Sequence, residues 1–228
     1  MRKTNHFKAE DHSIYSQKYQ LSLIEVFRFE LASLFGRLFL SKKPPVISAE
    51  YNLLNLGCGE SFFEGWVNAD FFKARFWKVP KSLWMLDIRY PLRCKSDYWE
   101  GIFSEHTVEH LYPTEVHNLF RELFRTLKKG CWLRISVPDL RKYIDYYLGK
   151  PVPEKFSRWA TGSEAIRTLT QNWGHRSVWD ASLLSSFLQK VGFINVREVK
   201  FRKGTDTRLL MDKEERKWES LYIEAQKP

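Results

Sequence analysis

The sequence predicts an α/β fold with a mostly parallel sheet and helices on both faces. From residue 51 onward, short apolar runs alternate with helical stretches, which is typical of parallel strands joined by crossover helices. Glycines or acids follow three of the expected strands, at the edge of the sheet where ligands bind. The 228 residues are 43% hydrophobic and 16% aromatic, enough for a folded core, so a wholly disordered protein is excluded.

The first expected element is a helix over residues 21–40. Its four charged residues make a membrane-spanning role unfavourable, because each costs about 2.5–3.5 kcal/mol near a bilayer centre. Packing on the domain core is favoured, and contact with a membrane or a partner is the alternative. Residues 42–45 then break the helix, so 1–45 form an extension to a domain spanning 46–228. The apolar face of the helix consists of Leu23, Ile24, Phe27, Leu31, Leu34, Phe35 and Leu38.

The domain itself is expected to alternate strands and helices. Apolar residues recur every three or four positions in a helix over 113–128 and in a second helix that Asp180 caps and Gly192 ends. An insertion at about 151–178 separates the fifth strand from this second helix and is expected to cover a ligand. The predicted strands are 51–56, 66–69, 83–88, 101–104, 131–137, 193–201 and 220–225.

The strongest local signal is the run Leu-Asn-Leu-Gly-Cys-Gly at residues 54–59. Glycines directly after a buried strand let the backbone turn sharply and approach a ligand closely. The dinucleotide fingerprint requires a third glycine at the position of Phe62, so a site for NAD is disfavoured. On its own the run also fits an ordinary turn between a strand and a helix.

Two acids follow the next strands. Asp70 ends the second strand, where a carboxylate accepts hydrogen bonds from both hydroxyls of a ribose. Asp87 ends the third strand and is placed to accept from an exocyclic amine. Either acid alone is more often a solvated strand end. Together with Gly57 and Gly59 they indicate a nucleoside-like ligand.

With these motifs the sequence resembles the class I S-adenosylmethionine-dependent methyltransferases over roughly residues 51–225. The 54–59 run is similar to the first motif of that family, and residues 127–138 resemble the turn into its fifth strand. The runs Gly-Trp-Val-Asn-Ala-Asp, Glu-His-Leu and Ser-Val-Pro-Asp-Leu are similar to predicted bacterial methyltransferases associated with surface-polysaccharide genes. The resemblance implies a Rossmann-like methyltransferase fold with a seven-stranded sheet, and S-adenosyl-L-methionine as the cofactor.

The resemblance also implies site residues. Asn55 stands where the family usually has an acid that helps to orient the methionine amino group. The acceptor side is expected to use His106, Asp139 and His175 as candidate catalytic residues. Asp139 as a helix N-cap and His175 as a loop histidine stay open as alternatives. The implied cofactor-binding residues are Asn55, Gly57, Cys58, Gly59, Asp70, Asp87, Ser104 and Glu105.

Residues 106–110, His-Thr-Val-Glu-His, match the H-x-x-E-H pattern of some zinc proteases. Those enzymes carry the pattern on a long helix and use a third, downstream carboxylate ligand. Pro113 ends any long helix here, so zinc hydrolysis is disfavoured and no metal is expected. His110 is assigned to packing or capping.

The net charge of +10, from 37 basic and 27 acidic residues, predicts an anionic partner. Because the cofactor is itself positive at sulfur, the excess is expected to serve an anionic acceptor or surface. We expect an enzyme of polysaccharide biosynthesis that methylates a small-molecule or glycan acceptor. An RNA methyltransferase and a non-catalytic binding protein on the same fold are the alternatives.

The three cysteines and the polar amino terminus bear on location. An odd cysteine count in a chain of this length is atypical of a secreted disulfide scaffold. No signal-peptide cleavage site follows the first apolar run. We therefore expect a cytoplasmic protein, with residues 21–40 as the point of peripheral contact with the inner membrane face.

Overall fold

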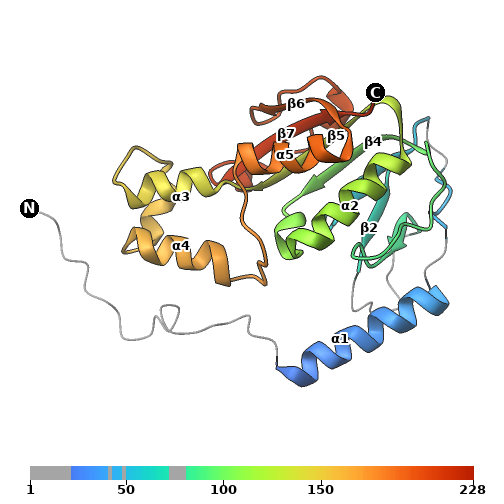
Figure 1. Ribbon diagram of the computed structural model, residues 1–228, viewed down its shortest axis with the longest axis horizontal. Helices are drawn as coiled ribbons and strands as arrows, with labels where there is room; N and C mark the ends of the chain where they lie inside the picture. The colour runs from blue at the N-terminus through green and yellow to red at the C-terminus, as the bar shows by residue number, and fades with distance from the viewer. Residues whose placement is uncertain (1–21, 41–42, 48–49, 72–80) are drawn as a thin grey trace, which may run out of the picture.

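A computed structural model of the chain describes residues 22–40, 43–47, 50–71 and 81–228 (Figure 1). One sheet runs in the strand order β3-β2-β1-β4-β5-β7-β6. The pairs among the first five strands are parallel, and β7 is antiparallel to both of its neighbours. The predicted seven-stranded, mostly parallel sheet is thereby confirmed. The strands are β1 (Leu53–Leu56), β2 (Val67–Asp70), β3 (Leu83–Met85), β4 (Trp99–Glu105), β5 (Leu127–Pro138), β6 (Ile194–Val199) and β7 (Ser220–Gln226).

Two helices cover one face of this sheet, α2 (Pro113–Thr126) and α5 (Ala181–Val191), and they lie side by side (Figure 1). Both are predicted by the sequence, although α2 ends two residues early because β5 begins at Leu127. The Asp180 carboxylate caps α5 by accepting from the Leu183 N–H, and Gly192 ends the helix with a φ of 114°. Two helices that the sequence does not delimit, α3 (Leu140–Tyr147) and α4 (Gly162–Gln171), lie beyond the carboxyl end of β5.

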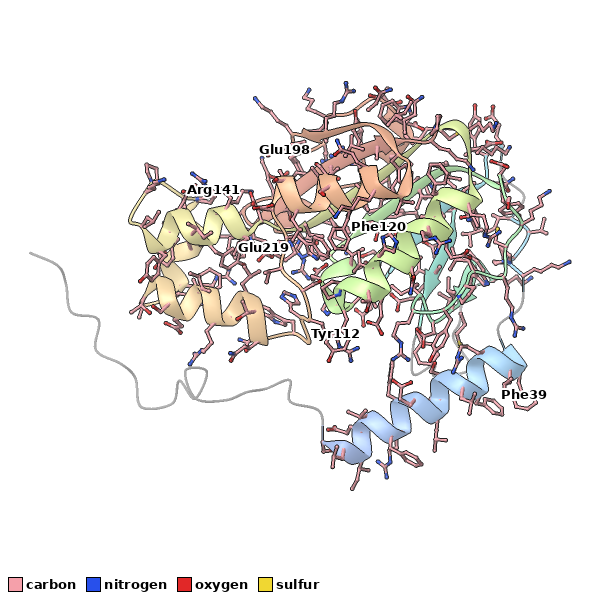
Figure 2. The ribbon with its side chains drawn as sticks, viewed as in Figure 1. Phe39, Tyr112, Phe120, Arg141, Glu198 and Glu219 are labelled. Carbon is pink, nitrogen blue, oxygen red and sulfur yellow. The ribbon has the colours of Figure 1, made fainter. Side chains whose placement is uncertain are left out.

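The main core fills the space between these helices and the sheet. Alternate residues of each strand point to one face, and residues three or four apart on each helix point back at them. Phe120, labelled in Figure 2, is a fully buried member from α2. The strand residues include Leu54, Leu56, Ile102, Leu133, Ile135, Val137 and Ile223, and the helix residues include Val116, Leu119, Leu123, Leu184 and Leu188.

The opposite face is covered, among the described residues, by Phe63 from the connection after β1 and by the segment 200–219, whose helical parts are short 3-10 turns. The described residues therefore do not show a long helix packed on this part of the face, and residues 72–80 lie outside them. Leu209 from one of these turns packs with Leu53, Trp66 and Phe103. Arg134 of β5 holds the same segment, because its buried guanidinium pairs with Asp212 at 2.5 Å.

The amino-terminal helix α1 (Leu23–Phe35) continues into a π-helical turn (Gly36–Leu40) and packs through the face opposite to the one predicted. Leu23 is 89% exposed and Phe27 is 63% exposed, so the apolar face points outward. Phe39, near the end of the helical run in Figure 2, is exposed as well. The favoured prediction, that this face packs on the core, is therefore wrong.

Polar contacts hold α1 in place. Glu30 pairs with Arg89 at 2.6 Å, and the buried Ser33 hydroxyl donates to the Asp87 carboxylate. Phe29 adds an edge-to-face ring contact with Phe71 at 5.3 Å. In the described part of the chain, no helix combines the length and apolar character needed to cross a bilayer.

Candidate functional site

Two adjoining cavities lie at the carboxyl ends of the parallel strands. The first cavity, of about 420 Å³, is lined by Gly57, Gly59, Asp70 and Asp87, among others. The second cavity, of about 540 Å³, lies toward α4 and the segment 213–219. His106 and His110 line both cavities and form the wall between them. Volumes of this size suit small-molecule ligands, whose sites span roughly 300–1,000 Å³.

Gly57 and Gly59 shape the floor of the first cavity for different reasons. Both have a positive φ, +69° and +53°, which disfavours any residue with a Cβ. A Cβ on Gly57 would lie 2.0 Å from the Thr107 hydroxyl oxygen, so this glycine lets the β1 turn pack against the loop after β4. A Cβ on Gly59 would meet no atom within 4 Å, so this position opens into the cavity.

Asp70 lies beside these glycines at the end of β2. Its Oδ2 accepts from the Gly59 N–H at 2.8 Å, and its Oδ1 accepts from the Phe71 N–H at 2.6 Å. Burial raises the pKa of Asp70, and the two backbone hydrogen bonds partly counter the rise. Each carboxylate oxygen has a second acceptor position, so the carboxylate remains able to bind the hydroxyls of a ligand.

Asp87 also lines the first cavity, but its oxygens are already engaged. The Arg89 Nη2 and Nε donate at 2.7 Å and 3.0 Å, and the Ser33 hydroxyl and the Arg89 N–H donate as well. Burial by itself would raise the pKa of Asp87, but the hydrogen bonds from Arg89 and Ser33 lower it on balance. Here Asp87 anchors Arg89 and α1, and its acceptor positions are filled by protein groups.

Four other predicted cofactor residues line neither cavity. The Asn55 side-chain amide donates to the Ser61 carbonyl at 2.8 Å, inside the turn that follows β1. Cys58 is buried, and burial raises its pKa to about 12. Ser104 is buried, and the Glu105 Oε1 accepts from the Lys213 N–H at 3.1 Å. The structure brings Gly57, Gly59, Asp70 and Asp87 together around the first cavity. Asn55, Cys58, Ser104 and Glu105 do not line it.

Several lining residues of the first cavity are not among the predicted ones. Phe29 comes from α1 and Arg176 from the connection between α4 and α5, so no local motif links either to the glycine turn. Arg89 follows Asp87 by two residues, and Thr107 follows His106 directly. Proximity in sequence to a predicted residue is the only signal that points to these last two.

His106, Glu109, His110 and His175 gather between the two cavities. The 106–110 segment coils into a short 3-10 turn after β4, and the backbone N–H of Arg176 donates to the Glu109 carbonyl at 2.8 Å, which brings His175 over the turn. The ligand-type atoms of Glu109, His110 and His175 all lie within 4.8 Å of one another. The His106 Nδ1 lies 3.5 Å from the Glu109 Oε1. From the sequence, no metal is predicted and His110 is assigned to packing.

Burial shifts the pKa of every group in this cluster. It raises the pKa of Glu109 to about 8 and lowers that of His110 to about 4. It also lowers the pKa of His106 well below the usual 6.5, with the charge of Arg216 adding to the effect. The imidazoles are therefore neutral near pH 7 and present nitrogen lone pairs.

The predicted acceptor-side residues fare differently. His106 and His175 both line the second cavity. Asp139 lines neither cavity, because it caps α3: its Oδ1 accepts from the Arg141 N–H at 3.0 Å. The alternative role of Asp139 as a helix N-cap is the one the structure shows.

No protein-family model and no curated protein matches the sequence of this chain. In structure it is similar to a SAM-dependent methyltransferase from Archaeoglobus fulgidus, with a TM-score of 0.51 and 16% identity over 96% of this chain and 100% of the other. It is likewise similar to an S-adenosylmethionine-dependent methyltransferase from Mesorhizobium loti, with a TM-score of 0.51 and 16% identity over 87% of this chain and 99% of the other.

These matches define the class of fold. The protein has the Rossmann-like α/β fold of the S-adenosylmethionine-dependent methyltransferases, with one antiparallel strand in the sheet. At 16% identity the likeness extends to the fold alone.

Proposed function

We propose that the protein is a methyltransferase that binds S-adenosyl-L-methionine in the first cavity and its methyl acceptor in the second. The observation that carries the proposal is the meeting of Gly57, Gly59 and Asp70 at one wall of a cavity that adjoins another. When bound, the cofactor supplies a methyl group on a positively charged sulfonium, and its transfer to an acceptor oxygen or nitrogen leaves a neutral thioether.

The lining residues of the first cavity fit most of this cofactor. Gly59 leaves open space, and the Asp70 carboxylate keeps acceptor positions for a ribose. Phe29 and Phe71 provide an aromatic wall suited to an adenine ring. Asp87 fits less well, because Arg89 and Ser33 occupy its oxygens. Adenine recognition is therefore assigned to the aromatic wall.

The second cavity supports an anionic acceptor. Four cations line it, against three acids, and the surplus of positive charge attracts phosphate or carboxylate groups; the cations are Lys155, Arg158, Lys213 and Arg216, and the acids are Glu109, Glu215 and Glu219. Trp218 lies on the same wall, with the Arg158 guanidinium 4.7 Å from its ring centre. Flat aromatic surfaces of this kind suit sugar rings, so we favour a small anionic molecule or an acidic glycan as the acceptor. The charge of +10 keeps RNA as the second candidate.

His106 is the chain's candidate for taking a proton from the acceptor. It lies on the wall shared by the two cavities, and its Nε2 is held by the Ser220 hydroxyl at 2.7 Å. A base helps only where the acceptor must lose a proton, whereas alignment of the two reactants in adjoining cavities speeds any methyl transfer.

We also propose that α1 lies on a membrane, at the cytoplasmic face where a glycan acceptor of polysaccharide biosynthesis would be met. Two observations support this proposal. The apolar face of the helix points outward, and residues 1–44 contain eight Lys and Arg against four Asp and Glu. An apolar helix face flanked by basic residues binds anionic lipid surfaces.

Calorimetric titration with S-adenosyl-L-methionine tests cofactor binding. We expect the wild-type chain to bind and Asp70→Asn to bind about 10- to 100-fold more weakly, since a hydrogen bond to a charged group contributes about 1.5–3 kcal/mol. Asp97→Asn is the matched control, because Asp97 lies outside both cavities and pairs with Lys227. Absence of binding at millimolar cofactor would overturn the enzyme proposal.

Release of S-adenosylhomocysteine tests the acceptor class. We expect turnover with sugar phosphates or uronic-acid oligosaccharides and none with the matched neutral sugars. Turnover confined to generic RNA, with a steep dependence on salt, would replace the glycan proposal by the RNA one.

A further inference from the structure

We propose that Glu109, His110 and His175 bind a divalent transition-metal ion, for which zinc is the best match, at the edge of the second cavity. The metal site itself stands on the geometry of these side chains. Only its role, to hold an oxygen atom of the methyl acceptor, rests on the function proposed above.

The Glu109 carboxylate is the first reason. Glu109 is 1% exposed, and neither of its side-chain oxygens has a hydrogen-bond partner. A buried carboxylate that accepts no hydrogen bond is costly, and a protein retains one where a cation or a proton balances it. The ion pairs of the described residues offer it only His106, at 3.5 Å.

The histidines are the second reason, because their protons point away from this carboxylate. The His175 Nδ1 lies 2.6 Å from the Leu169 carbonyl oxygen, which can only accept, so Nδ1 carries the proton and Nε2 keeps its lone pair. The His110 ring is hydrogen-bonded to the Gly174 backbone. A backbone carbonyl behind the imidazole is the usual arrangement around a metal-ligating histidine.

His106 completes the same pattern. The Ser220 hydroxyl donates its own proton to the Arg216 carbonyl, so it must accept from the His106 Nε2 at 2.7 Å. The Nδ1 that faces Glu109 therefore carries a lone pair and donates nothing. Three neutral imidazoles thus surround a carboxylate without supplying a hydrogen bond to it. A cation bound by Glu109, His110 and His175 satisfies the carboxylate and two of these imidazoles at once.

The donor set indicates which ion fits. Two imidazoles and one carboxylate suit zinc and its divalent neighbours, whereas magnesium and calcium prefer oxygen ligands. The ligand atoms lie within 4.8 Å of one another, and binding of zinc at bonds of about 2.0–2.2 Å would require them to move closer together. All three residues line the second cavity, so the remaining coordination positions face the acceptor.

Metal analysis of the purified full-length chain, after incubation with zinc chloride and removal of free zinc, tests the proposal. We expect about one zinc per chain in the wild type. Glu109→Gln and His175→Ala should hold zinc at least tenfold more weakly, because each removes one of three ligands. His117→Ala on α2 is the matched control, since it removes an imidazole outside both cavities.

Cobalt substitution and melting curves distinguish loss of the metal site from misfolding of a variant. Cobalt should give a visible ligand-field absorption in the wild type and in His117→Ala, and zinc should raise the melting temperature of those two proteins but not that of Glu109→Gln. Equal zinc content in the wild type and Glu109→Gln, or no cobalt absorption, would overturn the metal site. Parallel titration with S-adenosyl-L-methionine separates this outcome from failure of the proposed function, because neither metal measurement requires the cofactor.

Discussion

Gly57 and Gly59 share a left-handed backbone but differ in what surrounds them. We expect Gly57→Ala to destabilise the fold by about 2–5 kcal/mol, since it adds overpacking of about 1–3 kcal/mol to a backbone cost of about 1–2 kcal/mol. Gly59→Ala carries only the backbone cost, but its methyl group points into the first cavity and should weaken cofactor binding. Urea unfolding and calorimetry measure the two effects.

The pair of variants serves as its own control. Equal losses of stability would mean that Thr107 yields to the added methyl group, and unchanged cofactor affinity in Gly59→Ala would place the ligand elsewhere. A further comparison of Gly57→Ala with and without Thr107→Ala shows how much of the loss comes from the Thr107 hydroxyl and methyl groups, which lie 2.0 Å and 2.3 Å from the added Cβ.

At the residue scale the sequence predicts the polar wall of the first cavity and misses the cluster between the cavities. Gly57, Gly59 and Asp70 lie at strand ends, where the strand pattern fixes their position. Glu109 and His110 belong to a pattern that is typical of a protease helix, whose third ligand is a carboxylate. Here the additional group is His175, which only the path of the chain between α4 and α5 brings into reach.

Asn55 differs from these residues in where its side chain lies. It occupies a motif position near Gly57, but it does not line the first cavity, and its side-chain amide donates to the Ser61 carbonyl and to the Asn68 Oδ1 on β2. Alternation along β1 assigns Asn55 to the same sheet face as Leu53, whereas Leu54 and Leu56 face the helices. Motif position alone does not specify which way a side chain points.

At the scale of elements, α1 is the clearest departure from expectation. A stripe of apolar residues usually marks the buried face of a helix, and the sequence contains nothing to contradict that rule. The orientation of α1 follows from the polar surface of the domain against which it packs. There Arg89 pairs with Glu30, and Asp87 accepts a hydrogen bond from Ser33. The sequence likewise predicts α2 and α5 well, because each buries a regular stripe beneath clear end signals.

The docking of α1 should depend on pH through Asp87. The pKa of this carboxyl lies below its ordinary 3.8 in the folded chain, so its contribution is fully present above about pH 4 and is lost as the pH falls through the folded value. We expect Asp87→Asn to cost about 1–3 kcal/mol at neutral pH and progressively less toward about pH 3. Urea unfolding across this range measures the difference.

The groups that face Asp87 set the control for this experiment. Arg89 lies beside it, and Ser33 and Glu30 come from α1. Ser33→Ala removes the hydrogen bond from α1 to Asp87 but leaves the ion pairs of Arg89 with Asp87 and Glu30, so it should weaken docking and reduce, without abolishing, the pH dependence. If the difference in unfolding free energy between the wild type and Asp87→Asn stays constant with pH, the charge on Asp87 does not hold the helix.

At the scale of the whole molecule, the outward face of α1 should bind lipid. We expect the full chain to bind anionic vesicles and Phe27→Ser with Leu34→Ser to bind at least about tenfold more weakly, since a buried apolar side chain contributes about 1.5–3 kcal/mol. Vesicle sedimentation at low and high salt measures the affinity. Leu148→Ser is the matched control, because Leu148 is 58% exposed at the far end of the molecule after α3.

Two results would count against a lipid surface as the partner of α1. One is equal binding of the double variant and the wild type to vesicles. The other is a concentration-dependent dimer that the same double variant abolishes, since the apolar face would then serve contact between copies of the chain.

The position of α1 makes the proposed binding of the cofactor and the proposed binding of a lipid surface thermodynamically linked. Its inner side contributes Phe29 to the first cavity, while its outer side carries the apolar face. If a lipid surface favours the docked helix by some factor, bound cofactor must favour lipid binding by the same factor, because coupling between two sites is reciprocal. An enzyme built this way would hold its methyl donor most tightly where its acceptor is assembled.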